Sequence, residues 1–356
     1  MTKRLILHSN SLLGRGDVLN AINIIKALQS TSDVDCLILS PSSKGFINPN
    51  VLTYIKDIGF NVNLYNSQEE LVGFANKFKA SHIYYMKAGR YDGSYLDGVP
   101  GFVHAVFNHF EPHGEVYSYV SKWLYDNVNK SPSMFHWMSS YPKWKMLQYR
   151  SGSNYFPDLK KKVQWLAHPV VVSNPSKLNV REKFNIPDSG KIITRFGGSG
   201  QFSDPAGPSA IKTLLEKRKD LFFLLWNVKE FTDHERVIFC NEYISESDKA
   251  AIILESSLML NCRLMGESFG FSVCESLAMG RPILAPSLER NPKMDANHID
   301  LLQPYDLLYN NVNDLVEKVE KNLDIEANPD DLKTAVNKFS PQIFSRRFHE
   351  IFLNIY

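Results

Sequence analysis

Two glutamates in the C-terminal half combine a residue type and a spacing that could do chemistry. Glu267 and Glu275 are eight positions apart within residues 266–282, GESFGFSVCESLAMGRP. The pattern predicts a helix over 269–279, with Gly280 as its left-handed cap. A helix rises about 1.5 Å per residue, so the carboxylates lie up to about 12 Å apart. A glycoside hydrolase pair needs about 5–10 Å. The spacing instead suits two acceptors that grip hydroxyls at the two ends of a sugar nucleotide.

The residues after the first glutamate form a candidate anion site. Ser268, Phe269 and Gly270 lie where the predicted helix begins. Backbone N–H groups there have no partner inside the helix, and the helix dipole is positive. Gly270 lets the backbone come close to a ligand. The turn therefore suits a diphosphate; the alternative is a plain helix start with Glu275 as a surface carboxylate.

A histidine-rich stretch follows a predicted strand over 102–107. It contains His104, His109, Glu111, His113 and Glu115. The stretch lacks the HxH and HExxH spacings of zinc sites, so we expect no metal ion.

Two glycine-bearing turns follow predicted strands. Gly14 and Gly16 come after the first strand, and Gly197 and Gly198 come after a strand over 191–196. Glycines there allow close backbone approach to a ligand, although a plain tight turn is the alternative.

Length and composition limit the class of protein. At about 150 residues per domain, 356 residues predict two domains. Lys+Arg is 40 and Asp+Glu is 38, a balance that argues against a dedicated nucleic-acid binder. Four scattered cysteines predict reduced core thiols and a reducing compartment. No apolar run approaches the ~20 residues of a membrane span, so we expect a cytoplasmic protein.

Short apolar strands alternate with helices twice along the chain. This alternation predicts two α/β domains with parallel sheets, over 1–168 and 176–340. A proline-bearing linker lies between them. An amphipathic helix over 341–356 is expected to pack back on the first domain. Ligands bind outside the carboxyl ends of such strands, so we expect the site in the cleft between the domains.

The segment around Glu267 and Glu275 resembles the signature of retaining glycosyltransferases of family 4. These enzymes have the GT-B fold, two Rossmann-like domains facing across a deep cleft. The resemblance implies that Glu267 contacts donor sugar hydroxyls and that Glu275 binds the nucleotide ribose. It also implies that the amides of Ser268, Phe269 and Gly270 contact the diphosphate or the sugar.

The glycine turns are also similar to those of the family. The resemblance places Arg195 against the diphosphate, beside Gly197 and Gly198. The family often adds a lysine a few residues later, but positions 196–211 contain none. The candidate substitutes for it are Gln201, Ser203 and Arg263. In the first domain, Gly14 and Gly16 correspond to a loop near the diphosphate and the acceptor.

The resemblance also implies a histidine near the reaction centre. His104 matches best, with His109 as its competitor. His109, Glu111 and His113 would then face the acceptor.

These patterns together predict a cytoplasmic glycosyltransferase. It would move a sugar from a nucleoside diphosphate sugar to a hydroxyl acceptor, a glycan, a lipid-linked sugar or a small molecule. The resemblance implies retention of the anomeric configuration. We expect no cofactor, no metal ion and no nucleic-acid partner.

Three alternatives remain. The first is an epimerase or phosphorylase on the same fold, and the second is a non-catalytic sugar-nucleotide or glycan-binding protein. A dinucleotide oxidoreductase is the least favoured, because Ser203 and Leu19 stand where G-x-G-x-x-G needs its third glycine.

A basic segment in the first domain is expected to form a solvent-exposed surface. The alternative is that it contacts a membrane or an anionic acceptor. Its cations are Lys143, Lys145, Arg150 and residues 160–162.

Overall fold

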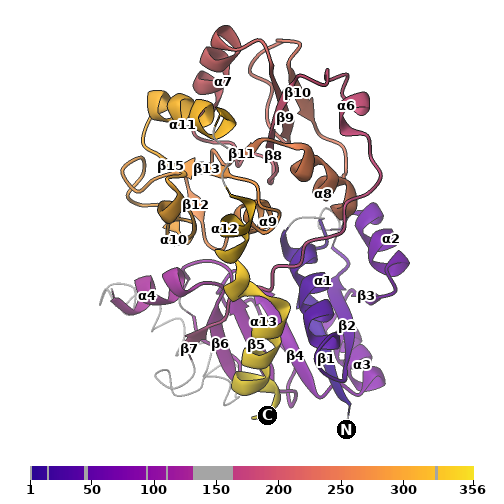
Figure 1. The fold of residues 1–356 in the computed structure, drawn as a ribbon. Coiled ribbons are helices and arrows are strands. Elements are labelled where there is room, and N and C mark those ends of the chain that lie inside the picture. Colours follow the sequence, from indigo (N-terminus) through magenta and orange to yellow (C-terminus); the bar gives the residue numbers. More distant parts are fainter. Residues whose placement is uncertain are drawn as a thin grey trace. The chain divides into compact units, whose positions relative to one another are not determined.

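The chain divides into two compact units. The computed structural model describes residues 2–13, 16–43, 47–93, 95–109, 111–130, 163–324 and 328–356. Unit 1 comprises Met1–Pro169 and Phe339–Tyr356, and unit 2 comprises Val170–Lys338 (Figure 1).

Unit 1 is built on a seven-stranded parallel sheet with the order β3-β2-β1-β4-β5-β6-β7. Its described strands are β1 (Lys3–Ser9), β2 (Val34–Pro41), β3 (Asn61–Tyr65), β4 (His82–Lys87), β5 (Gly101–Ala105), β6 (Val116–Tyr119) and β7 (Val163–Trp165). The central strands are buried on both faces, as their continuous apolar sequences predict.

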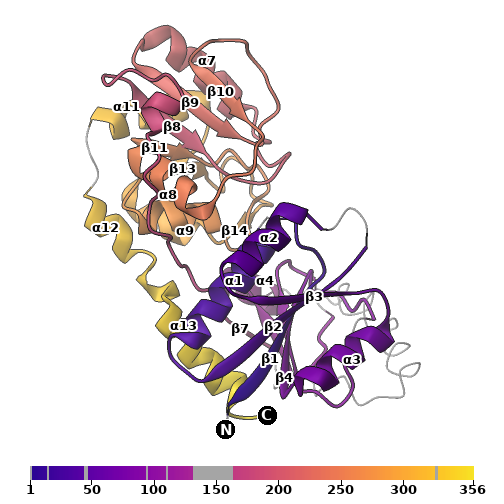
Figure 2. The same ribbon diagram turned by 90° about the vertical axis from the view of Figure 1, so that its right-hand side faces the viewer.

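Helices cover both faces of this sheet. Those described are α1 (Gly16–Gln29), α2 (Pro49–Asp57), α3 (Gln68–Phe78), α4 (Lys122–Lys130) and α13 (Pro341–Phe348), the last continued by a π-helical turn (His349–Leu353). Figure 2 shows α1 and α13 on one face and α3 on the other.

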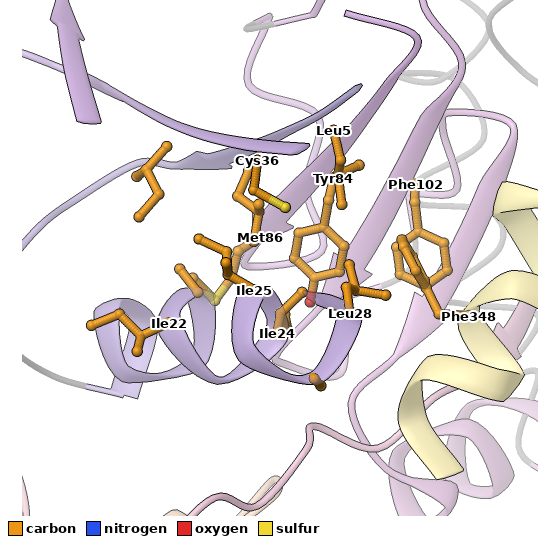
Figure 3. Close-up of a cluster of buried hydrophobic side chains, with 14 of the residues drawn as sticks. Leu5, Ile22, Ile24, Ile25, Leu28, Cys36, Tyr84, Met86, Phe102 and Phe348 are labelled. Atoms are coloured by element: carbon orange, nitrogen blue, oxygen red, sulfur yellow. The ribbon is translucent and has the colours of Figure 1, made fainter. Parts of the chain in front are cut away.

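The C-terminal helix completes the core of unit 1, as its amphipathic pattern predicts. Phe344, Phe348 and Phe352 are fully buried. Figure 3 shows Phe348 beside Phe102 of β5, while side chains of α1 face Tyr84 of β4. The ring centroids of Phe102 and Phe348 lie 5.0 Å apart. The last segment therefore belongs to the first unit although unit 2 separates the two in sequence.

Unit 2 contains a six-stranded parallel sheet with the order β10-β9-β8-β11-β13-β15. Its strands are β8 (Lys191–Arg195), β9 (Leu221–Trp226), β10 (Val237–Cys240), β11 (Leu258–Leu260), β13 (Ile283–Pro286) and β15 (Leu308–Tyr309). A separate pair is formed by β12 (Gly266–Glu267) and β14 (Asp295–Ala296).

The helices of unit 2 follow the expected alternation. They are α6 (Val180–Lys183), α7 (Ala206–Lys217), α8 (Glu246–Glu255), α9 (Phe271–Ala278), α10 (Ile299–Leu302), α11 (Val312–Asp324) and α12 (Pro329–Thr334), with 3₁₀ turns at Gln303–Tyr305 and Asn337–Phe339. No helix within the described ranges is long and apolar enough to cross a membrane.

The structure corrects one part of the predicted fold. Residues 117–150 are rich in Tyr, Trp, Lys and Ser, which predicts helices and loops, but Val116–Tyr119 forms strand β6. All four of its residues are buried, but the strand is short and Ser118 interrupts its apolar run, so the sequence gives no strand signal. The two-sheet α/β architecture itself is confirmed.

Strand order reverses once in each sheet. The reversal lies between β1 and β4 in unit 1 and between β8 and β11 in unit 2. Doubly wound sheets bind ligands in the crevice outside the carboxyl ends of the strands at such points. The topology therefore indicates one candidate ligand-binding edge in each unit, at the carboxyl ends of β1 and β4 in unit 1 and of β8 and β11 in unit 2. We call each of them the selected edge of its unit.

Candidate functional site

The glutamate segment lies at the selected edge of unit 2. Strand β11 leads through a loop into β12, which contains Glu267, and α9 begins at Phe271. Gly270 caps this helix with φ of 90°, and Gly280 after its end has φ of 69°. Gly280 therefore has the left-handed conformation that the sequence predicts. The helix is shorter than the expected 269–279, because residues 268–270 form the turn before it.

Glu267 is held firmly by its neighbours. Its Oε1 accepts a hydrogen bond of 2.9 Å from Asn261 Nδ2, and its Oε2 accepts one of 2.9 Å from Arg263 Nη1. Its backbone oxygen accepts from the amide of Asn297 at 3.1 Å. The residue is only 9% exposed. Its carboxylate is thus pre-oriented rather than free to rotate in solvent.

The second glutamate belongs to a buried ion-pair group. Glu275 is 5% exposed, which excludes its interpretation as a surface carboxylate. Lys249 Nζ, on α8, lies 3.0 Å from Glu275 Oε1 and 2.8 Å from Glu246 Oε2. Burial raises the pKa of the Glu275 carboxyl, and the lysine charge opposes this shift. The sequence analysis missed Lys249; its only signal is a cation in the otherwise apolar run 249–253.

Arg195 does not occupy the exposed position that the resemblance implies. Its guanidinium donates to the backbone oxygens of Gly197 and Gly198, both at 3.2 Å, and to that of Trp226. The residue is 3% exposed, and burial lowers its pKa to about 10. Arg195 therefore carries its charge at neutral pH, and its hydrogen bonds hold the backbone of the glycine turn in place. This corrects the expectation of direct contact with a diphosphate.

The glycine turn is closed around this arginine. A Cβ on Gly197 would lie 2.6 Å from Arg195 Nη2, so only glycine fits there without a shift. The amide of Gly198 donates to Gln201 Oε1 at 2.9 Å. Ser203 Oγ accepts from the amide of Leu264 at 3.1 Å. These contacts join the loops that follow β8 and β11.

The three substitutes considered for the missing lysine are all engaged within the site. Gln201 closes the glycine turn, Ser203 ties the two loops, and Arg263 pairs with Glu267. The side chain of Arg263 is 23% exposed, Ser203 is exposed and Gln201 is half-buried, so all three retain some access to a ligand.

Two residues beyond the predicted site complete it. Asn297 Nδ2 donates to the oxygen of Phe269 at 2.8 Å and so fixes the turn. His298 donates from Nε2 to the oxygen of Pro286 at 3.0 Å. Its buried Nδ1 has no partner among the described residues. Neither residue lies in a recognisable sequence pattern.

His104 proves to be a core residue of unit 1. It has no exposed surface. Its Nε2 donates to the oxygen of Leu166 at 2.6 Å, and its Nδ1 accepts from the hydroxyl of Tyr84. Burial lowers its pKa to about 4, so the ring is neutral. The proposed catalytic role for His104 is therefore corrected to a structural one.

The residues expected on the acceptor side divide into two groups. His113 is 1% exposed and donates from Nδ1 to the oxygen of Glu111 at 2.6 Å. It does not face solvent, which corrects its assignment. Glu111 and His109 keep part of their surface exposed. The carboxylate of Glu111 accepts from the amide of Tyr91 at 3.0 Å.

Some predicted residues cannot be placed. Gly14 lies outside the described residues, and Gly16 is the first residue of α1. The basic segment around Lys143, Lys145, Arg150 and 160–162 lies in the undescribed range 131–162. Within the described part of the chain, no group of three or more His, Cys, Asp or Glu side chains could hold a metal ion.

Replacing Gly270 by alanine should lower the stability of the protein. A Cβ there would lie 3.1 Å from Glu267 Cβ, and φ of 90° is strained for any L residue. We expect a loss of about 1–3 kcal/mol in unfolding free energy, measured by urea denaturation. Gly59→Ala is the control for backbone strain alone, because its φ is 85° and nothing lies within 4 Å. An unfolding free energy of Gly270→Ala equal to that of wild type would contradict this prediction.

Comparison with known proteins supports the fold. No protein-family profile and no curated protein sequence matches the chain. Anabaena HepE in complex with UDP and glucose is similar with a TM-score of 0.63, 13% identity and 100% of both chains covered. A putative UDP-N-acetylglucosamine 2-epimerase from Listeria monocytogenes gives 0.59 and 11%, covering 99% of this chain and 96% of its own. The spinosyn forosaminyltransferase SpnP gives 0.60 and 13%, with 99% of each chain covered. The chain therefore has the GT-B fold of two Rossmann-like units.

Proposed function

We propose that the chain is a glycosyltransferase that binds a nucleoside diphosphate sugar in unit 2 and transfers the sugar to a hydroxyl acceptor. The observation that carries this proposal is the placement of Glu267 and Glu275. Both carboxylates are almost buried, and they lie on either side of a left-handed glycine turn at the edge where strand order reverses. The shared fold with HepE, which was solved with UDP and glucose, supports the same ligand class.

In this proposal Glu267 binds the donor sugar. Its two hydrogen bonds, from Asn261 and Arg263, fix the carboxylate before the ligand arrives. A pre-oriented carboxylate loses little side-chain entropy on binding a sugar hydroxyl. For this reason we assign Glu267 to binding the reacting sugar, and not merely to balancing the charge of Arg263.

Glu275 binds the ribose of the nucleotide. Burial raises the pKa of the Glu275 carboxyl, and the Lys249 ammonium at 3.0 Å opposes that rise and favours the ionised form. An ionised carboxylate is the stronger acceptor for ribose hydroxyls. Lys249 is therefore a positioning residue for nucleotide binding.

The diphosphate lies over the turn at residues 268–270. The start of α9 supplies backbone N–H groups and the positive end of the helix dipole. Arg195 adds a buried positive charge next to the neighbouring glycine turn, and its hydrogen bonds to described residues go to neutral carbonyl oxygens. It acts on the diphosphate through its charge rather than by contact.

Transfer then proceeds on one face of the sugar. The bond between the anomeric carbon and the diphosphate breaks as the acceptor oxygen forms its bond to the same carbon. The departing diphosphate takes the proton of the acceptor hydroxyl. Catalysis consists mainly of positioning and of stabilising the leaving group. The anomeric configuration is retained.

Sugar transfer should persist in EDTA. The helix amides and Arg195 stabilise the leaving diphosphate, the task that other transferases give to a divalent ion. We expect the initial rate in 5 mM EDTA to remain within about twofold of the rate in magnesium, a change of under 0.5 kcal/mol in the barrier. Loss of transfer on chelation and its recovery with magnesium or manganese would contradict this assignment.

A sugar-nucleotide 2-epimerase is the second candidate. The observation that favours it is that several solved structures with the same fold are described as UDP-N-acetylglucosamine 2-epimerases. Such an enzyme would change the donor without any acceptor.

A donor screen distinguishes these functions. The full chain is incubated with UDP-glucose, UDP-galactose, UDP-N-acetylglucosamine, GDP-mannose and dTDP-glucose, with and without hydroxyl acceptors. Released nucleoside diphosphate is quantified, and proton NMR of the anomeric signals follows the sugar. Acceptor-dependent release with a retained anomer supports the transferase. An epimerised donor without acceptor supports the second candidate, and binding without turnover supports a non-catalytic protein.

A further inference from the structure

A third arginine lies among the loops of unit 2 that carry the proposed donor site. The two already described are compromised as direct partners of a diphosphate, because Arg195 is 3% exposed and Arg263 is paired with Glu267 at 2.9 Å. Arg290 lies in the loop that follows β13, the strand next to β11 in the sheet. It has no part in the sequence-predicted site or in the proposed function.

A buried carboxylate holds the guanidinium of Arg290. Asp204 follows the glycine turn at 196–203, and its side chain has no exposed surface. Arg290 donates to it from Nη2 to Oδ1 at 2.8 Å and from Nε to Oδ2 at 3.2 Å. Asp204 also accepts from the Tyr309 hydroxyl at 3.0 Å and from the Ala206 amide at 2.9 Å. These bonds fix the carboxylate, and the carboxylate in turn orients the arginine.

The arginine is the member of this pair that a ligand can reach. Its side chain is 28% exposed, and its Nη1 group donates to none of the described residues. The hydrogens directed at Asp204 come from Nε and Nη2, so the other edge of the planar guanidinium is available. The pair is neutral as a whole, but its buried member is negative and its accessible member is positive. An approaching anion therefore meets the cation first.

Hydrogen bonds place the loop of Arg290 beside the loops that follow β8 and β11. Asn291 Nδ2 donates to the oxygen of Leu264 at 2.7 Å. The amide of Asp204 donates to the oxygen of Cys262 at 2.9 Å. Three loops thus meet at the selected edge of unit 2, and Arg290 contributes an accessible cation to their junction.

A guanidinium held along one edge suits a phosphate group. Arginine binds phosphate oxygens through planar, charge-assisted hydrogen bonds, and a guanidinium that is already oriented loses little side-chain entropy on binding. We propose that Arg290 contacts the diphosphate of the donor and that Asp204 is the positioning residue that orients it. This inference rests on the proposed function and adds a residue that binds the charged group by contact. Arg195, in contrast, acts on the same group from a buried position.

Calorimetry on the full chain tests this contact. UDP is titrated directly, and pyrophosphate is titrated in competition with UDP. We expect Arg290→Gln to weaken both ligands by about tenfold or more, because a charge-assisted bond to the group that they share is lost. Lys293→Gln is the matched control, since it removes the same charge from an exposed position of the same loop. It should change the UDP affinity by less than about twofold, because solvent and salt screen a charge that makes no contact.

A double variant separates binding from folding. Arg290→Gln leaves the Asp204 carboxylate buried without its cation, so lower stability is a second route to weaker binding. Adding Asp204→Asn removes that carboxylate and restores the net charge of the wild type. The double variant should recover most of the stability lost in urea denaturation, but it should not recover UDP affinity.

Equal UDP affinity in Arg290→Gln and Lys293→Gln would overturn the proposal. Wild-type affinity in the double variant would also overturn it, because Arg290 would then serve only to neutralise Asp204. GDP and dTDP are titrated if UDP does not bind. A wild-type protein that binds none of the three nucleotides would contradict the proposed function itself, and this inference with it.

Discussion

Replacing Glu267 by glutamine should lower the rate of sugar transfer by about 10²–10³-fold, the usual cost of losing one charged contact to a reacting group. Glutamine keeps the size of the side chain but lacks the negative charge that would hold the sugar hydroxyl. Its oxygen can still accept a hydrogen bond from Asn261 or Arg263. The glutamine amide has a single acceptor oxygen, so one of these two donors loses its partner at a buried site, and the unfolding free energy should fall by about 1–3 kcal/mol.

Steady-state rates with the best donor of the screen, together with urea denaturation, test this result. Glu216→Gln on α7 is the matched control, an exposed glutamate away from the site. Turnover of Glu267→Gln close to that of Glu216→Gln would remove Glu267 from the reaction.

Replacing Glu275 by alanine should weaken nucleotide binding by about ten- to a hundredfold, the cost of losing hydrogen bonds to a charged acceptor. The variant should also lose stability, by about 1–3 kcal/mol, because Lys249 is left buried with only Glu246 as its partner. Calorimetry with UDP and urea denaturation measure the two effects.

A double variant separates ribose binding from folding. Adding Lys249→Met to Glu275→Ala removes the buried ammonium that has lost one of its two partners and should recover most of the lost stability. It should not recover nucleotide affinity, since the ribose acceptor is still missing. An unchanged dissociation constant in the single variant would show that Glu275 only balances Lys249.

The architecture follows from the sequence more completely than the site does. Periodic apolar runs predict the two parallel sheets, and the amphipathic pattern of 341–356 predicts that Phe344 and Phe348 join a core. Strand β6 escaped prediction because it has only four residues and Ser118 interrupts its apolar run. A hydrophobic pattern is least specific in such short segments.

The sequence did not predict the direction in which several of the candidate side chains point. Arg195 and His104 both lie at strand ends, where the resemblance places reactive groups, yet both point into the protein. Their partners, the oxygens of Trp226 and Leu166, are distant in sequence. Lys249 pairs with Glu275 across 26 positions for the same reason. Such contacts depend on how the elements pack, which local spacing does not encode.

Hydrogen–deuterium exchange of the full chain with and without UDP tests the central claim most directly, because it reports where the nucleotide binds. The account predicts slower exchange in residues 264–280, which hold the left-handed turn and the start of α9, and in the glycine turn at 196–203. GDP and dTDP serve as alternative probes if UDP does not bind. Protection confined to other segments, or none with any of the three nucleotides, would contradict a nucleotide site in unit 2.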